Sequence, residues 1–140
     1  MEKIQKPKVE PSEMSRPFWD AAENGRLTLQ CCAKCGQKRH YPQLLCSHCY
    51  SDEVVWEAAS GCGAIHSWTV AHHAFHPGFA ADLPYTLVTI DLEEGVRALG
   101  LWRSDVAPKI GLPVRGQFET RDDGIDLVFR PVPVTNNEDI

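Results

Sequence analysis

No stretch of this 140-residue sequence approaches the roughly 20 apolar residues that are needed to cross a bilayer. Residues 1–17 also lack the apolar segment of a secretory signal. Hydrophobic residues make up 43% and charged residues 24% of the chain, which is ordinary globular usage and excludes wholesale disorder. We therefore expect a soluble, cytoplasmic protein that forms one ordinary domain or two very small ones.

Positive charge is scarce in residues 61–140, which hold six Lys or Arg against eleven Asp or Glu. Residues 1–60 hold eight of each kind. Nucleic-acid binders gain much of their affinity from cations that replace counterions along the phosphates. The acidic part of the chain therefore disfavours nucleic acid as a partner.

Motifs of common catalytic sites are also missing. There is no Gly-rich phosphate loop, no Gly-x-Ser-x-Gly motif and no paired-carboxylate motif. His72, His73 and His76 resemble a metal or general-base cluster, but adjacent strand residues face opposite ways, and no acidic residue follows before Asp82. We interpret these histidines as strand-end and loop residues, which disfavours a stand-alone metalloenzyme.

Cysteine is absent after residue 62, and five of the six cysteines fall within 19 residues. A secreted disulfide framework would spread them along the chain, so this clustering indicates a metal site. Two Cys-x2-Cys pairs, each able to hold one ion from a tight turn, supply the four ligands: Cys32, Cys35, Cys46 and Cys49. Zn²⁺ prefers such a tetrahedral set, although a rubredoxin-type iron site would use the same ligands.

Four thiolates close the coordination shell, so we expect one structural metal ion per chain and no catalytic water. Cys31 adjoins Cys32 but does not easily point to the same ion, and we expect a free, buried thiol. His40 and His48 are competing ligand candidates. Cys62 has no neighbouring cation in sequence that would activate it, and we interpret it as structural or incidental.

The remaining pattern predicts a mostly β chain. Residues 1–11 are expected to form a flexible arm. Residues 12–59 are expected to form a helix at 14–24, capped by Ser15, and a zinc ribbon. The expected strands of the ribbon are 26–30, 38–41 and 54–57. Two glycines in residues 60–63 indicate a boundary. Residues 60–131 then alternate with period two and predict a five-stranded closed barrel, and residues 132–140 a polar tail. The expected barrel strands are 64–73, 85–92, 96–102, 113–119 and 125–129, with a long binding-type loop at 75–84.

Several short motifs occur in one order along residues 16–131. They are Phe18-Trp19, Gly25-Arg26-Leu27, Cys-x2-Cys-Gly with the second Cys-x2-Cys, Ser60-Gly61-x-Gly63, Pro84-Tyr85, Asp91-x3-Gly95, Gly111-x-Pro113-Val114 and Phe129-Arg130-Pro131. This order resembles the bacterial and archaeal family in which a rubredoxin-like zinc ribbon precedes an OB-fold barrel. Ser47 and Tyr50 depart from it, since the family often has Pro and Gly there.

The resemblance implies a function. Characterised members are non-catalytic accessory subunits in acyl-CoA metabolism that pair, as hetero-oligomers, with thiolase-superfamily or MaoC-type enzymes. The partner carries the catalytic residues, and the ribbon–OB subunit stabilises it or shapes its acyl-CoA channel. The four cysteines named above would be the zinc ligands, and the segment from His76 to Phe79 would approach the partner or the CoA.

Contacts to CoA need cations for its phosphates. The barrel candidates are Arg97, Arg103, Lys109 and Arg115, with plain surface solvation as the alternative. We therefore expect CoA contacts, direct or through the partner, at His76, Phe79, Arg97 and Arg103. The rival function is a single-stranded nucleic-acid module that stacks bases on Trp68, Trp102 and Tyr85.

Overall fold

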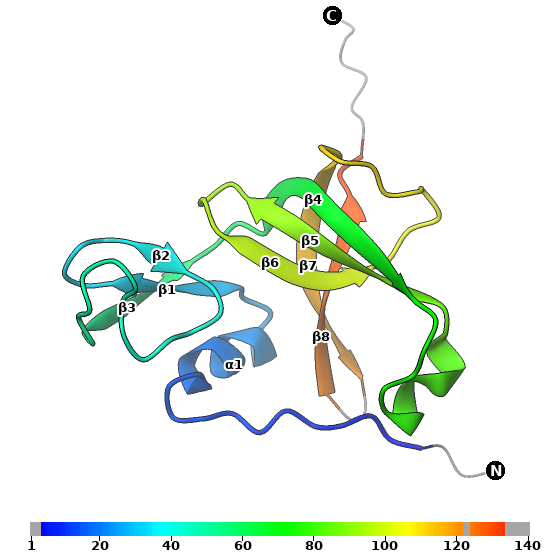
Figure 1. Cartoon of the computed structure of the whole chain (residues 1–140), viewed down its shortest axis with the longest axis horizontal. Coiled ribbons are helices and arrows are strands. Elements are labelled where there is room, and N and C mark those ends of the chain that lie inside the picture. Colours follow the sequence, from blue (N-terminus) through cyan, green and yellow to red (C-terminus); the bar gives the residue numbers. More distant parts are fainter. Residues whose placement is uncertain (1–3, 122–123, 134–140) are drawn as a thin grey trace, which may run out of the picture.

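The computed structural model describes residues 4–121 and 124–133 and consists of a small three-stranded sheet, one helix and a closed barrel (Figure 1). Most of the expected tail, residues 134–140, and the middle of the last hairpin turn lie outside the described residues. No helix in the described part of the chain is long and apolar enough to span a membrane. The mostly β architecture expected from the sequence is confirmed.

The ribbon contains helix α1 (Arg16–Glu23) and the strands β1 (Thr28–Cys32), β2 (Lys38–Arg39) and β3 (Val54–Ala58) in the antiparallel order β2-β1-β3. Strand β1 lies two residues later than predicted because its pairing with β3 continues through Cys32. Ser15 stands at the N-cap, but its side chain makes no cap hydrogen bond, so the predicted cap is wrong. Its hydroxyl bonds Ser12 instead.

The barrel is built from β4 (Cys62–Ala71), β5 (Tyr85–Leu92), β6 (Arg97–Trp102), β7 (Pro113–Arg121) and β8 (Gly124–Pro131). Its closed order is β4-β5-β6-β8-β7, in which β6 and β8 run parallel and the other neighbours antiparallel. This is the five-stranded barrel that the sequence predicts. The long loop before β5 contains a 3-10 helix, η1 (Pro77–Asp82).

The boundary predicted at residues 60–63 falls between the end of β3 at Ala58 and the start of β4 at Cys62, but Gly63 itself does not interrupt a strand. Gly63 lies inside β4, where it pairs with β5 and β7 at once. A Cβ at this position would stand 2.3 Å from the backbone oxygen of Asp91. The glycine is therefore needed because two strands approach each other closely, which is a common reason for glycine inside a strand.

One hydrophobic core joins the ribbon to the barrel. Phe18 of α1 and Leu29 of β1 belong to the same buried cluster as Ile65, Ile90 and Phe129 of the barrel. The Phe18 ring also lies 6.1 Å from the ring of Phe118 on β7. A helix this short is marginal alone, so packing against the barrel stabilises it, as expected from its apolar side.

Candidate metal centre and barrel cavity

The four predicted ligands come together at the end of the ribbon. Cys32 ends β1, Cys35 lies in the following turn, and Cys46 and Cys49 lie in the loop between β2 and β3. Their sulfur atoms all lie within 4.8 Å of one another, and no other group of three or more His, Cys, Asp or Glu ligand atoms converges in the described part of the chain. All six cysteines are free.

The sulfur spacing fits a tetrahedral ion. The Sγ atoms of Cys32 and Cys49 are 3.5 Å apart, and those of Cys35 and Cys46 are 3.6 Å apart. With Zn–S bonds of about 2.3 Å, the edges of a tetrahedron are about 3.8 Å long. The cluster therefore has the size that one four-coordinate metal ion needs.

The two Cys-x2-Cys turns have the same backbone structure. The Gly36 amide donates to the Cys32 carbonyl at 2.9 Å, and the Tyr50 amide donates to the Cys46 carbonyl at 2.9 Å. Gly36 has φ 82° and Tyr50 has φ 63°, so both take the left-handed conformation. Tyr50 therefore fills the position where glycine is usual without changing the turn.

Backbone amides also point at the sulfurs. The amides of Lys34 and Cys35 donate to Cys32 Sγ, and the amide of His48 donates to Cys46 Sγ, each at 3.4 Å. The Cys35 amide is the main cause that lowers the pKa of Cys32 to about 6, and the Cys49 amide acts likewise to lower the pKa of Cys46. Both turns thus favour thiolates.

At Cys35, opposing influences act on the pKa of the thiol. The Gln37 amide acts to lower its pKa, but desolvation of the sulfur and hydrogen bonds with the neighbouring thiols outweigh this and raise the pKa to about 12. Four thiols in contact cannot all ionise unless a cation balances them. A divalent ion resolves this conflict, so the donor set fits a metal.

The other candidate ligands lie elsewhere. The ring of His40 packs against Phe18 at 5.3 Å, and burial lowers the pKa of His40 to about 4. His48 contributes its backbone amide to the centre. Cys31 is buried and donates to the Gly36 carbonyl at 3.4 Å, and burial raises the pKa of its thiol. The free, buried thiol expected at Cys31 is confirmed.

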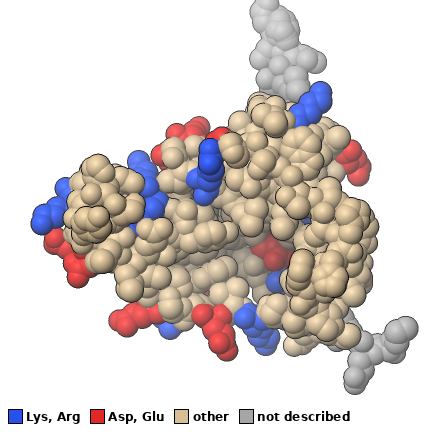
Figure 2. All heavy atoms as spheres, in the orientation of Figure 1, with Lys and Arg blue, Asp and Glu red and all other residues tan. Residues whose placement is uncertain are grey.

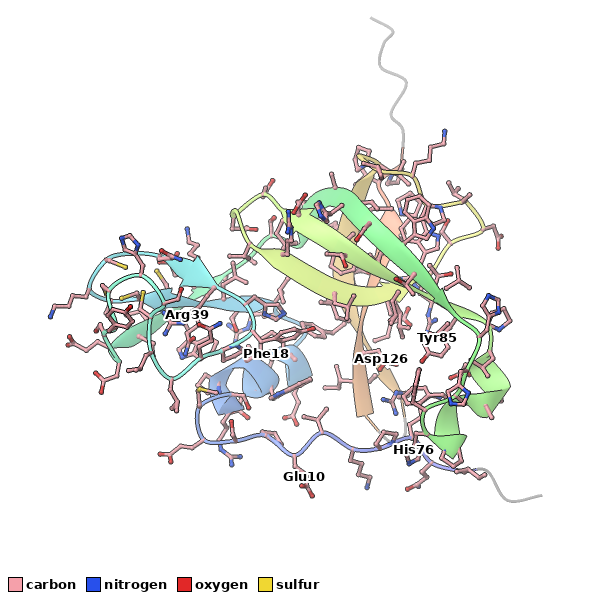
Figure 3. All side chains as sticks on the ribbon, viewed as in Figure 1. Glu10, Phe18, Arg39, His76, Tyr85 and Asp126 are labelled. Carbon is pink, nitrogen blue, oxygen red and sulfur yellow. The ribbon has the colours of Figure 1, made fainter. Side chains whose placement is uncertain are left out.

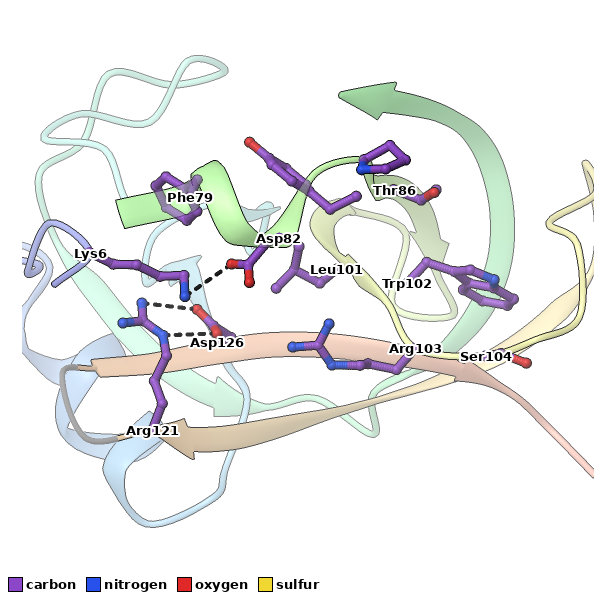
Figure 4. Close-up of a pocket in the computed structure, with 12 residues that line it drawn as sticks. Lys6, Phe79, Asp82, Thr86, Leu101, Trp102, Arg103, Ser104, Arg121 and Asp126 are labelled. Carbon is purple, nitrogen blue, oxygen red and sulfur yellow. Dashed lines mark hydrogen bonds and ion pairs between the residues drawn. The ribbon is translucent and has the colours of Figure 1, made fainter. Parts of the chain in front are cut away.

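A second feature is a cavity of about 370 Å³ between η1, the barrel strands and the N-terminal arm (Figure 4). Its apolar wall includes Phe79, Tyr85 and Trp102, and its charged wall includes Arg103 and the pair formed by Arg121 and Asp126 at 3.0 Å; the remaining lining residues are Lys6, Asp82, Pro84, Thr86, Leu101 and Ser104. Figure 2 shows this face hollowed near its centre, with acidic and basic atoms inside the hollow.

The N-terminal arm forms one side of this cavity. Lys6 Nζ lies 3.0 Å from a carboxylate oxygen of Asp82 and 5.7 Å from the centre of the Phe79 ring. The backbone of residues 5–6 packs so closely on Gly78 that a Cβ there would stand 2.6 Å from the Gln5 oxygen. Arm residues 5 and 6 therefore contact η1, a contact that the polar, proline-rich sequence of the arm does not indicate.

Of the four residues expected to contact CoA, two line the cavity and two lie outside it. Phe79 and Arg103 line the cavity, whereas His76 and Arg97 do not. The ring of His76 stays near Phe79 at 6.3 Å, and its Nδ1 accepts from the Gly78 amide. Arg97 pairs with Asp91 at 2.8 Å on the β5–β6 hairpin. Sequence reasoning missed Lys6, Arg121 and Asp126, because only the closed barrel brings them together.

The three aromatic residues considered for base stacking do not form one exposed platform. Trp102 is buried, and its indole Nε1 donates to the Val106 carbonyl at 2.9 Å. Tyr85 is half-buried in the cavity wall, and Trp68 is exposed on β4. On the face shown in Figure 2, Lys and Arg are scattered and do not gather into a stripe. The geometry gives the nucleic-acid alternative no support.

Comparison with known families matches both parts of the chain. Residues 19–55 match the rubredoxin-like zinc ribbon domain of ChsH2, and residues 56–119 match the C-terminal OB-fold domain of ChsH2.

Two curated relatives are similar to this chain in sequence. A probable enoyl-CoA hydratase alpha subunit of Thermomonospora curvata is 40% identical over 81% of this chain and 36% of its own length. The 3-oxo-4,17-pregnadiene-20-carboxyl-CoA hydratase alpha subunit of Mycobacterium tuberculosis is 32% identical over 79% of this chain and 38% of its own length. The chain thus spans somewhat more than a third of these relatives.

Solved structures agree. A chain of the Ltp2-ChsH2(DUF35) aldolase superposes with a TM-score of 0.76 and 34% identity, covering 90% of this chain and 98% of that one. A DUF35 protein of unknown function from Sulfolobus solfataricus superposes with a TM-score of 0.59 at 14% identity, covering 87% of both chains, and shares the fold alone. The resemblance drawn from the sequence is confirmed: the chain belongs to the ChsH2 family of zinc-ribbon and OB-fold proteins.

Proposed function

We propose that this chain is a non-catalytic accessory subunit in acyl-CoA metabolism. It pairs with a catalytic subunit of the thiolase superfamily, or with a MaoC-type hydratase, stabilises it and helps to shape its acyl-CoA site. The observation that carries the proposal is the 34% identity to a chain of the Ltp2-ChsH2(DUF35) aldolase, of which the match covers 98%. Both hydratase relatives are also named as alpha subunits.

A non-catalytic role agrees with the chemistry of the cysteine centre. We infer that the centre holds one structural Zn²⁺, which would cross-link the two Cys-x2-Cys turns and leave no open position for water. In finger peptides such binding contributes about 10–16 kcal/mol to folding. Six free cysteines also fit a reducing compartment, for which we propose the cytoplasm.

A partner would cover apolar surface that the chain leaves in water. Phe75, beside η1, is 85% exposed, and Leu44 and Tyr50 of the second ribbon turn are 74% and 75% exposed. Large aromatic and aliphatic side chains of this kind often anchor protein interfaces. Because the ribbon and the η1 loop lie on opposite sides of the molecule in Figure 1, a partner that contacts both would span the ribbon and the barrel.

The cavity supports a contact with the CoA part of the substrate. OB-folds bind ligands with their second and third strands and with the loops that join strands one and two and strands four and five. In this barrel those parts are β5, β6, the η1 loop and the β7–β8 hairpin, which line the cavity. Phe79 and Tyr85 offer aromatic faces, and Arg103 offers a cation whose Nε lies 3.2 Å from Glu119.

Copurification tests the partner. The tagged chain, expressed with the product of a neighbouring thiolase-like or hydratase-like gene, should copurify with it at a fixed stoichiometry. We expect the pair, and not the isolated chain, to convert an acyl-CoA. Turnover by the isolated chain, or absence of any acyl-CoA enzyme among copurifying proteins, would contradict the proposal. Binding of single-stranded nucleic acid that weakens steeply with salt would favour the rival function.

Two matched arginine variants test the CoA contact. Arg103→Ala removes one cation of the cavity wall, and Arg97→Ala removes an equally carboxylate-paired arginine on the β5–β6 hairpin. The sequence predicts a CoA contact at Arg97 as well, but Arg97 lies outside the cavity. We therefore expect Arg103→Ala to weaken binding of CoA to the complex several-fold in calorimetry and Arg97→Ala to leave it unchanged. Equal effects of the two variants, or no effect of Arg103→Ala, would place CoA outside this cavity.

A further inference from the structure

Arg39 is a buried cation that pairs with no carboxylate among residues 4–121 and 124–133. Only 7% of the Arg39 surface is exposed to solvent. Its Nε donates to the side-chain oxygen of Gln30 at 2.5 Å, and its Nη2 donates to the Gln43 carbonyl at 3.4 Å. Its Nη1 is buried and has no hydrogen-bond partner among the described residues. Burying a charge against neutral acceptors alone is costly, so this position calls for a negative charge nearby.

The hydrogen bonds of Arg39 tie together the two chain segments that carry the cysteines. Gln30 lies opposite Arg39 in the β1–β2 register and two residues before Cys32, so Gln30 and Cys32 share one face of β1. Gln43 lies three residues before Cys46, and its amide donates to the same Gln30 oxygen at 2.7 Å. Figure 3 shows Arg39 within the ribbon, the module that contains the clustered sulfurs.

A loaded centre supplies the missing negative charge. Four thiolates around one divalent ion leave a net charge of about −2. The neighbouring Lys38 faces the other side of the sheet, where its Nζ lies 3.6 Å from Glu57. We propose that Arg39 is the buried counter-charge of the four-cysteine metal centre and raises its metal affinity through its charge. The proposal rests on a metal-loaded centre and not on the identity of any partner.

Metal affinity of the full chain gives the first test. Zn²⁺ and Co²⁺ dissociation constants are measured by competition with a chelator for the wild type, Arg39→Met, Arg39→Lys and the control Lys38→Met. We expect Arg39→Met to weaken binding about 10–100-fold, the range typical of residues that support metal ligands. Arg39→Lys should keep most of the affinity, and Lys38→Met should change it less than threefold. Equal losses for Arg39→Lys and Arg39→Met would overturn the charge role.

A second test separates charge from packing. Cys49→His replaces one thiolate by a neutral ligand and reduces the negative charge of the loaded centre from about −2 to about −1. Because the attraction scales with charge, halving the charge of the centre halves the interaction energy. The factor by which Arg39→Met weakens metal binding should therefore fall from, for example, a hundredfold to about tenfold. The Co²⁺ absorption spectrum reports whether each variant keeps a tetrahedral site. Cys35→His, at an exposed ligand, serves as a second background.

The results of these two tests distinguish the counter-charge role of Arg39 from the metal centre itself and from the pairing with a catalytic subunit. An unchanged factor in both histidine backgrounds would mean that Arg39 acts through packing and hydrogen bonds, which overturns the counter-charge. A wild-type chain that binds neither Zn²⁺ nor Co²⁺ would overturn the metal centre and the counter-charge together. Neither result bears on the pairing with a catalytic subunit, which copurification tests separately.

Discussion

The Phe129 ring lies directly against Gly100 across the inside of the barrel. A Cβ at residue 100 would stand 2.7 Å from two ring carbons of Phe129 and 2.8 Å from the Leu127 oxygen. Gly116 contacts the same ring from β7, where a Cβ would also stand 2.7 Å from it. Phe129 is therefore held between two strands that must lack side chains at the contact.

Gly100→Ala should consequently destabilise the barrel. Overpacking of this kind typically costs about 1–3 kcal/mol, which chemical denaturation resolves. Leu99→Ala, at the exposed neighbouring position, is the matched control and should cost less. In a Phe129→Leu background the added methyl group should cost less than in the wild type, because the ring that it meets is gone. Equal costs in the two backgrounds would refute the contact.

Cys46→Ser should disrupt the ribbon and spare the barrel. The variant removes one of the four sulfurs, and metal binding contributes more folding free energy than so small a module can obtain from its own core. We expect a metal-deficient protein in which residues 30–50 lose protection in hydrogen exchange while strands β5 and β6 keep theirs. A full metal complement with native protection in those residues would show that the ligands are misassigned.

His40 should make the folded state sensitive to mild acid. Burial lowers the pKa of His40 from 6.5 to about 4, so the unfolded chain binds more protons than the folded chain between these values. Stability is therefore unaffected above about pH 6.5 and decreases as the pH falls towards 4. Between pH 7 and pH 5 the loss should be about 1–2 kcal/mol.

The variant His40→Gln isolates this contribution from acid release of the metal. Gln does not titrate, whereas the cysteine centre titrates in both proteins. Denaturation at pH 7 and pH 5 should therefore show a smaller decrease for the variant than for the wild type. The same decrease in both proteins would mean that His40 is not held neutral by the fold.

Gly78→Ala should detach the N-terminal arm without unfolding the barrel. The new methyl group would meet the backbone of residues 5–6, whereas the 3-10 helix itself tolerates alanine. We expect faster tryptic cleavage after Lys8 and an unchanged melting temperature. Ala81→Ser, an exposed change on the same helix, is the control. Unchanged cleavage in Gly78→Ala would show that the arm does not depend on this contact.

The sequence alone determined the four-cysteine cluster and most of the strands, because both depend on local spacing. Two residues between paired cysteines dictate a turn that presents both sulfurs, and alternation with period two dictates strands such as Tyr85–Leu92, which has the predicted bounds. The ends of β1 and β4 were misplaced, because pairing with β3 and β7 decided them.

Only the tertiary structure decided the cavity and the surroundings of Arg39. Lys6, Phe79, Trp102 and Arg121 are far apart in the chain, and closure of the barrel together with the contact between the arm and η1 brings them around one cavity. Gly63 looks like a break in a linear pattern and proves, like Gly100 inside the predicted strand 96–102, to be a close contact between strands. The burial of Arg39 likewise depends on how the second ribbon turn folds back over β1 and β2. Such contacts join segments whose separation along the chain leaves no periodic signal, so packing alone determines them.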